Sequence, residues 1–409
     1  MAKVFLVTKL QTTNLGNQAL SMELIKLFEE NIGKENLYVA GRPLGLLGYS
    51  INKLKASPDP VKLFESWADA VVKKYRPLAG SSNVFKPRIN DFSLSKRKSL
   101  KLENFKRWLR PFKRAFDRFF LFDKQYVKRL NAINVADFLI YSGAGEASDN
   151  HVFLRQMLEL RVAQKLGKKT GAVNQSVVVR NEAFKKIVNL VYGNMNHVVV
   201  RGNISRDVII DSGVNKDKVS IAPDTAIKTN PPGWHSVKKT KKVAINIHEY
   251  IDFTWKDIET ILDKLKQYNR EIVYVTNEPL GDNPTVKKFR DDFNIPILED
   301  SSGYLDFTNK LAEFDYLIAV RLHSNIMALA VNVPVIPIEG LVWKTTELFD
   351  QLEYPIKTIN VKNADWLQSV LNAIDDIENK KIDFDGYFRN VLPRFKENVS
   401  NNVNWINNN

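Results

Sequence analysis

Short apolar runs alternate with segments of helical periodicity along most of the chain. In the first half, the apolar runs predict strands at residues 3–8, 37–40, 137–141, 169–173, 197–200 and 219–221. In the second half, they predict strands at residues 242–247, 270–275, 315–320 and 333–338. The segments between them space apolar residues three and four apart, which predicts helices. This alternation is typical of parallel sheets flanked by helices.

One irregular stretch divides this pattern in two. Residues 228–242, KTNPPGWHSVKKTKK, are rich in Pro, Gly and Lys and follow neither period, as expected of a linker. We therefore predict an N-terminal Rossmann-like domain at residues 1–227 and a C-terminal Rossmann-like domain plus tail at residues 243–409. Two such domains facing each other across a cleft form an α/β, GT-B-like architecture. The polar end of the tail, residues 401–409, is expected to be frayed; alternatively, the tail from Tyr387 to Trp405 packs back on the first domain.

The composition is that of an ordinary soluble enzyme. The 409 residues are 44% hydrophobic and 26% charged. No apolar run approaches the roughly 20 residues of a membrane span, and the N-terminal run is too short for a signal peptide. The absence of cysteine excludes disulfides and thiolate chemistry and favours a cytoplasmic protein. The five histidines lack metal-ligand spacing, so we expect no metal site.

The positive charge is concentrated in one insert. The net charge is +14, and residues 95–131 carry thirteen Lys or Arg against three Asp or Glu. Aromatic residues recur there at helical spacing, as at Phe105, Trp108, Phe112 and Phe116. A basic amphipathic helix is typical of a membrane-surface element; alternatively, its apolar face packs on the core. We predict binding to an anionic membrane at the inner face of the cell membrane. No nucleic acid is expected, because no reader motif accompanies the charge.

Two cationic side chains, Arg321 and His323, interrupt an apolar stretch. The predicted strand ends at Val320, and helical spacing begins at Asn325. Both residues therefore lie where a strand ends and a helix begins, which is where open α/β sheets bind ligands and where backbone N–H groups attract anions. A guanidinium suits a carboxylate or phosphate, and an imidazole suits acid–base chemistry. Alternatively, Arg321 pairs with a structural carboxylate and His323 caps or packs the helix.

Several short motifs, taken in order, resemble those of the polysaccharide pyruvyl transferase family. They are NLGNQAL from Asn14, SGAGE from Ser142, NQSV from Asn174, VVVRGN through Arg201, VSIAPDTA through Asp224 and VRLHSNIMALAVNVPVIPI through Arg321. Lys344 fits the family's lysine in the helix after the next strand. The resemblance covers most of the chain outside the insert. The sequence departs from the family at Asn17, where Asp is usual, and at Ala144 and Ser324, where Gly is usual.

The resemblance implies that pyruvate is transferred as a ketal from phosphoenolpyruvate to a sugar of a cell-surface glycan or its lipid-linked precursor. Phosphoenolpyruvate is then a co-substrate, and no cofactor is expected. The implied catalytic residues are His323, Arg321 and Glu146, the last as a carboxylate that draws a proton from a sugar hydroxyl. The implied donor-binding residues are Arg321, His323, Ser324, Asn325, Lys344, Glu339 and Gly340. The implied acceptor-binding residues are Asn14, Gly16, Asn17, Gly143, Gly145 and Arg201.

Other interpretations of these residues stay open. The loop around Gly16 is equally typical of a helix cap, and Arg201 and Asp224 end successive strands and suit an ion pair with each other. In GT-B enzymes, a carboxylate in the place of Glu339 often holds a ribose. The alternative function is therefore a glycosyltransferase that uses a nucleotide-activated sugar, such as a CMP-sugar. A third is a basic scaffold that binds anionic polymers.

Overall fold

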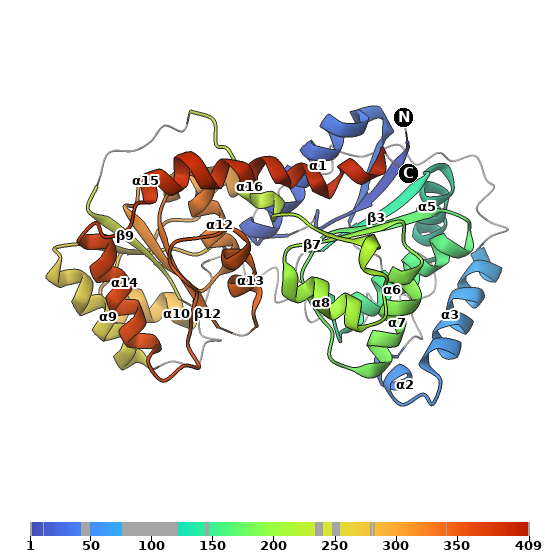
Figure 1. Cartoon of the computed structure of the whole chain (residues 1–409), viewed down its shortest axis with the longest axis horizontal. Helices are drawn as coiled ribbons and strands as arrows, with labels where there is room; N and C mark the ends of the chain where they lie inside the picture. The colour runs from blue at the N-terminus through green and yellow to red at the C-terminus, as the bar shows by residue number, and fades with distance from the viewer. Residues whose placement is uncertain are drawn as a thin grey trace. The chain divides into compact units, whose positions relative to one another are not determined.

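The computed structural model of the chain describes residues 2–10, 12–41, 50–75, 122–143, 147–233, 240–247, 254–278, 280, 283–340 and 342–407. They form two compact units (Figure 1). The first comprises Met1–Gln11, Leu24–Ala222 and Ser400–Asn409, and the second comprises Thr12–Glu23 and Pro223–Val399. Three short segments therefore group differently from the expected domains: residues 12–23 and 223–227 belong to the second unit, and residues 400–409 to the first.

The first unit is built on a six-stranded parallel sheet in the order β2-β1-β3-β5-β7-β8. Its strands are β1 (Val4–Val7), β2 (Leu37–Ala40), β3 (Phe138–Ser142), β5 (Lys169–Gln175), β7 (His197–Val200) and β8 (Val219–Ile221). Every residue of β1 and β3 is buried, as expected where helices cover both faces of a parallel sheet. The six strands expected from the apolar runs of the first half are therefore confirmed.

Helices flank this sheet. They are α1 (Leu15–Ile32), α2 (Ile51–Lys55), α3 (Pro60–Tyr75), α5 (Phe122–Val135), α6 (His151–Lys165), α7 (Glu182–Gly193) and α8 (Asn203–Asp211). Figure 1 shows α3, α6 and α7 packed against one another. A small parallel pair, β4 (Ala147–Ser148) and β6 (Val177–Val178), follows β3 and β5, and the apolar pattern does not predict it. Helix α1 starts among residues of the second unit and ends in the first.

The polar end of the tail is part of the core of the first unit. The Trp405 indole lies so close to Gly171 that a Cβ there would be 2.5 Å from its ring. Its Nε1 donates to the Asn402 carbonyl at 3.0 Å, and the Asn402 side chain accepts from the Asn174 backbone N–H at 3.1 Å. The expectation of fraying is therefore wrong up to residue 407, because Trp405 is buried together with Val403 and Ile406 in a segment that is otherwise polar.

The basic insert lies mostly outside the described residues, which resume at Phe122. Its last part belongs to α5, where Arg129 pairs with Glu159 and donates to the Gly41 carbonyl at 2.9 Å. Leu130 is buried as well. Arg129 and Leu130, at the end of the insert, therefore pack in the first unit and do not belong to the proposed membrane surface. Across the described part of the chain, no helix has the length and apolar character that a membrane crossing requires.

The second unit is built on a five-stranded parallel sheet in the order β10-β9-β11-β12-β13. Its strands are β9 (Lys242–Asn246), β10 (Glu271–Tyr274), β11 (Tyr316–Ala319), β12 (Val335–Glu339) and β13 (Ile359–Asn360). The four strands expected from the second half are confirmed, and β13 is an addition. Asn332 follows the helix after β11 with φ 58°, the left-handed conformation in which helices commonly end.

Helices also flank the second sheet. They are α9 (Trp255–Gln267), α10 (Pro284–Lys287), α11 (Tyr304–Leu311), α12 (Leu322–Ala330), α13 (Lys344–Gln351), α14 (Trp366–Glu378), α15 (Phe384–Gly386) and α16 (Leu392–Asn398). Helices α9 and α14 pack against each other (Figure 1). Around the expected linker, residues 225–228 form a 3-10 turn and β9 begins at Lys242. Residues 234–239 lie outside the described part.

Candidate functional site

Polar side chains gather at the carboxyl edge of the second sheet. Strand β11 pairs with β9 so that Ala319 lies opposite Asn246, which brings the carboxyl ends of the two strands level. The chain beyond β11 continues directly into Arg321 and His323, and the chain beyond β10 continues into Asn277 and Glu278. Because all strands are parallel, these side chains share one edge.

Arg321 begins helix α12 and carries an ion pair. It is the N-cap residue in extended conformation, and no side chain caps the helix. Its Nη2 donates to Glu278 Oε2 at 2.6 Å. Its Nε is buried and has no hydrogen-bond partner among the described residues. Part of the guanidinium is thus available to a ligand, beside helix N–H groups that also favour an anion.

The start of α1 completes this cluster. Asn14 donates from Nδ2 to Glu278 Oε1 at 3.1 Å and accepts from the Asn277 amide at 3.2 Å. The Asn14 side chain also accepts from the Asn17 backbone N–H at 3.0 Å, so it caps α1. Leu15 N donates to the Asn277 carbonyl at 2.8 Å. Asn14 is therefore both the helix cap and the residue that orients Glu278.

His323 lies between α1 and a buried carboxylate. Its Nε2 is 3.7 Å from Asp224 Oδ2; the His323 side chain is 13% exposed and Asp224 is fully buried. A Cβ placed on Gly16 would lie 2.2 Å from the His323 Cβ and 2.7 Å from its Nδ1. Glycine at position 16 is therefore what lets the imidazole lie against the first turn of α1. His323 Nε2 is buried and makes no hydrogen bond within the described ranges.

Two neighbours of His323 hold the turn in place. Ser324 donates from Oγ to Asn277 Oδ1 at 3.3 Å, and Asn325 donates from Nδ2 to the Ala319 carbonyl at 3.1 Å. Both side chains are fully buried. Their expected role in donor binding is therefore indirect in this geometry: they fix the backbone that presents Arg321 and His323.

Glu339 ends β12 and caps the next helix. Its carboxylate accepts from the Thr346 backbone N–H at 2.8 Å. Burial raises the pKa of Glu339, and hydrogen bonds from Thr346 and Thr345 partly offset the rise. Gly340 follows it directly, and Lys344 is the first residue of α13, half-buried. The carboxylate that the sequence offered as a ribose ligand thus holds the start of α13.

Two residues expected on the acceptor side, Gly145 and Glu146, lie outside the described residues. Arg201 is 2% exposed, and its guanidinium donates to the carbonyls of Asn174 and Gly143, both at 3.1 Å. This arrangement makes Arg201 a tie between the ends of β3 and β5. We therefore leave Arg201 and Gly143 out of the proposed substrate contacts.

Two residues of the cluster, Asn277 and Glu278, were not expected from the sequence. They directly follow the apolar run of β10 and precede a proline, which is the same polar-after-strand signal that identified Arg321. A pairing of Asp224 with Arg201 was one of the open interpretations; in the structure, Asp224 Oδ2 lies 3.7 Å from His323 Nε2. Within the described ranges, no three His, Asp or Glu side chains are grouped as metal ligands would be.

Comparison with known families gives one match. A family model described as polysaccharide pyruvyl transferase matches residues 14–340. The matched range contains Asn14, Gly16, Asp224, Arg321 and His323, which are the residues that the structure brings together. No curated protein matches the sequence.

Solved structures resemble the chain over its whole length. The Anabaena protein Alr3699/HepE, solved in complex with UDP, superposes with a TM-score of 0.55 at 11% identity, over 100% of this chain and 99% of that chain. The UDP-GlcNAc 2-epimerase of Neisseria meningitidis, bound to UDP-GlcNAc, gives a TM-score of 0.53 at 13% identity, over 100% of both chains. At such identity the likeness concerns the fold alone. It confirms the expected α/β, GT-B-like class.

Proposed function

The chain belongs to the polysaccharide pyruvyl transferase family and is a transferase; from this premise, we propose that it transfers pyruvate as a cyclic ketal from phosphoenolpyruvate to a sugar. The acceptor we propose is a cell-surface glycan or its lipid-linked precursor. The observation that supports the proposal is that Arg321 and His323 both lie at the start of α12, which no side chain caps, with Arg321 oriented by Glu278. A small donor with one carboxylate and one phosphate suits a guanidinium beside free helix N–H groups.

In the proposed reaction, two bonds form at one carbon of the donor. C3 of phosphoenolpyruvate takes up a proton, and a sugar hydroxyl adds to C2, which then has oxocarbenium character. The C2–O bond to phosphate breaks, a second hydroxyl of the same sugar adds to C2, and the two hydroxyl protons are released or taken up by C3 and phosphate. The products are one cyclic ketal and one inorganic phosphate, so no oxidant or metal enters the balance.

His323 is the proposed proton donor to C3. Its Nε2 makes no hydrogen bond within the described ranges and faces the buried Asp224 carboxylate at 3.7 Å. In this position the imidazole can serve as the general acid that protonates C3. On its other side the ring lies against Gly16, where a side chain would not fit. Glu146, outside the described residues, stays a proposed base on the acceptor side.

Arg321 is the proposed ligand for the donor carboxylate. The Nη2 bond to Glu278 orients the guanidinium, and its buried Nε is the donor left for the substrate. Lys344, at the first position of α13, is a proposed second positive charge for the phosphate. Desolvation would strengthen both contacts, because Arg321 is only 22% exposed before any ligand binds.

A glycosyltransferase with a nucleotide-sugar donor is the second candidate. It is supported by the solved structures of similar fold, two of which hold UDP or UDP-GlcNAc. A thermal-shift screen separates the candidates. Phosphoenolpyruvate should raise the melting temperature while UDP-, GDP- and CMP-sugars leave it unchanged. A shift with a nucleotide sugar and none with phosphoenolpyruvate would favour the glycosyltransferase.

Gly16→Ala is expected to disable the site while the chain still folds. The new Cβ would lie 2.2 Å from the His323 Cβ, so the imidazole must move by an ångström or more. A displacement of that size is expected to lower kcat by about 100-fold, and the overpacking to cost about 1–3 kcal/mol of stability. Phosphate release and thermal melting measure the two effects.

The matched control is Gly41→Ala, because a Cβ at Gly41 meets nothing within 4 Å. It should retain the wild-type rate. If Gly16→Ala also turned over at the wild-type rate, the position of His323 against α1 would have no part in the reaction.

The basic insert is proposed to hold the protein at an anionic membrane, where lipid-linked glycans are available. Each basic side chain near such a surface contributes on the order of 1 kcal/mol. The triple variant Lys96→Glu, Arg97→Glu, Lys98→Glu is therefore expected to weaken binding to phosphatidylserine vesicles by about 100-fold or more in sedimentation. A triple charge reversal elsewhere, at the exposed residues Lys34, Lys216 and Lys256, should bind as wild type. Equal binding of the wild type to uncharged vesicles would reject the membrane role.

A further inference from the structure

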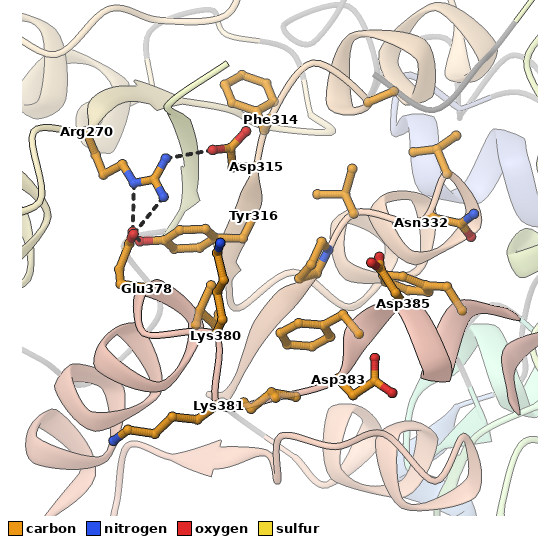
Figure 2. Close-up of a pocket in the computed structure, with 18 residues that line it drawn as sticks. Arg270, Phe314, Asp315, Tyr316, Asn332, Glu378, Lys380, Lys381, Asp383 and Asp385 are labelled. Carbon is orange, nitrogen blue, oxygen red and sulfur yellow. Dashed lines mark hydrogen bonds and ion pairs between the residues drawn. The ribbon is translucent and has the colours of Figure 1, made fainter. Parts of the chain in front are cut away.

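A cavity of about 670 Å³ opens at the amino edge of the second sheet, opposite the edge that carries Arg321. Tyr316, the first residue of β11, and Arg270, just before β10, line one part of it. Asn332, beyond the end of α12, and Asp385 in α15 line another (Figure 2). The volume lies within the range of roughly 300–1,000 Å³ that is usual for small-molecule sites.

Along one wall of this cavity, the charged side chains already pair with one another. Arg270 donates to Asp315 at 2.6 Å and to Glu378 at 2.6 Å, and the Tyr316 hydroxyl donates to Glu378 at 2.8 Å. Figure 2 shows these side chains joined in one network. Each guanidinium bond is therefore matched by a carboxylate of this wall, and the network is a poor partner for a charged ligand.

The opposite part offers unmatched polar groups. Asn332 and Asp385 are exposed, and within the described residues neither side chain makes a hydrogen bond. Figure 2 places both at the end of the cavity away from the Arg270 network. An amide and a carboxylate together supply the donors and acceptors that hydroxyl groups use.

Aromatic rings form an apolar surface next to these groups. Phe384 and Phe388 both line the cavity and are half-buried. Their ring centroids are 6.2 Å apart with planes at 24°, so they present a stacked pair. Flat apolar rings beside hydroxyl-binding groups suit a ligand that has an apolar face and a polar rim, as a sugar ring has.

The helix ends around the cavity disfavour an anion. Residues at the C-terminal ends of α11, α12 and α14, namely Ala312, Val331 and Glu378, line it. Helix C-termini carry partial negative charge on their last carbonyls. The lining side chains themselves nearly balance: the carboxylates of Asp315, Glu378, Asp383 and Asp385 face the cations of Arg270, Lys380 and Lys381. Together with the helix carbonyls, this balance favours an uncharged ligand over an anion.

We propose that this cavity binds an uncharged stretch of glycan, one to three sugar units long, with Asn332 and Asp385 on its hydroxyls and Phe384 and Phe388 against its ring faces. Five residues of extended chain separate Tyr316 from Arg321, which corresponds to roughly 16 Å through the sheet. The cavity is thus a second site, and a polymeric acceptor is the ligand that reaches both. Its use in the reaction rests on the proposed function, but the binding itself does not.

The test is direct binding without any donor. Full-length His323→Ala is titrated calorimetrically with neutral hexasaccharides of glucose in β1,4, β1,3 and α1,4 linkage and with chitotetraose. At least one should bind saturably. Asp385→Ala and Asn332→Gly, each added to His323→Ala, should weaken that binding about tenfold, the value of one hydrogen bond to an amide or carboxylate. Glycine is chosen because Asn332 has φ 58°.

The control is Asp207→Ala, which removes an exposed aspartate from the first unit and should bind as the His323→Ala parent does. Thermal melting verifies that each variant folds. If no glycan bound, if the two cavity variants bound unchanged, or if spermidine bound there in place of the glycans, the proposal would be overturned. Phosphate release from phosphoenolpyruvate by the wild-type chain is scored separately, so a failed glycan titration and a failed transferase assay are distinguishable.

Discussion

Replacing His323 with alanine is expected to lower kcat for pyruvyl transfer by about 10²–10⁴-fold, the usual contribution of a general acid. The donor should still bind, because Arg321 and the start of α12 are unchanged, so KM for phosphoenolpyruvate should move much less than kcat. The measurement is inorganic phosphate released per minute in the presence of a glycan acceptor. Melting temperature should fall little, since the imidazole makes no hydrogen bond within the described ranges.

Two further variants make this result specific. Asp224→Asn removes the charge that faces the imidazole at 3.7 Å, so kcat should fall, but less than in His323→Ala. His151→Ala, which removes an exposed histidine from the first unit, should behave as wild type. A kcat for His323→Ala within a few-fold of wild type would remove His323 from the chemistry.

The second large effect is expected at Arg321. Arg321→Ala should lower kcat/KM for phosphoenolpyruvate by about 10–150-fold, because one hydrogen bond between charged groups contributes about 1.5–3 kcal/mol. The loss should appear mainly in KM, since the guanidinium holds the donor in the ground state as well as in the transition state. Arg321→Lys should recover only part of the loss, because an ammonium keeps the charge without the planar fork.

Arg206→Ala, in α8 of the first unit, is the matched control and should leave both constants unchanged. Arg321→Ala also releases Glu278 from its ion pair at 2.6 Å, so the double variant Arg321→Ala, Glu278→Gln separates loss of the guanidinium from repulsion by an uncompensated carboxylate. If both variants kept the wild-type KM, the donor would have to bind elsewhere.

The strands could be predicted because each is a short apolar run whose residues are buried on both faces of a parallel sheet. β1 and β3 illustrate this, since every residue in them is buried. The grouping of segments into units could not be predicted in the same way. Residues 12–23 and 400–409 join units that are distant in sequence, and the tail is held by buried side chains, among them that of Trp405, packed over Gly171. Local periodicity contains no information on such a contact.

The position of the site could be predicted from a few neighbouring residues, but the partners of Arg321 and His323 could not. Arg321 and His323 interrupt apolar sequence exactly where a strand becomes a helix, and that signal lies within a few residues. Their partners come from other loops: Glu278 precedes Arg321 by 43 residues, and Asp224 belongs to a turn before the second sheet begins. Which residues become partners depends on which strand ends lie at the same edge of the sheet. That arrangement is visible only in the folded structure.

The same distinction explains Gly16. Its sequence context, Asn-Leu-Gly-Asn, is equally typical of a helix cap, and the structure gives that role to Asn14. The requirement for glycine comes from the imidazole 307 positions later, against which no Cβ fits. Because this requirement comes from a residue distant in sequence, the sequence around Gly16 does not reveal it.

The most direct test of the account is the mass of the acceptor after incubation with phosphoenolpyruvate. The surface glycan and its lipid-linked precursor, isolated from the source cell and freed of pyruvate by mild acid, serve as acceptors for the wild-type chain. The acceptor should gain C₃H₂O₂ for each inorganic phosphate released, and both changes should be much slower with Arg321→Ala. An acceptor that gains nothing from phosphoenolpyruvate, but gains a sugar residue when a nucleotide sugar is supplied, would contradict the proposed reaction.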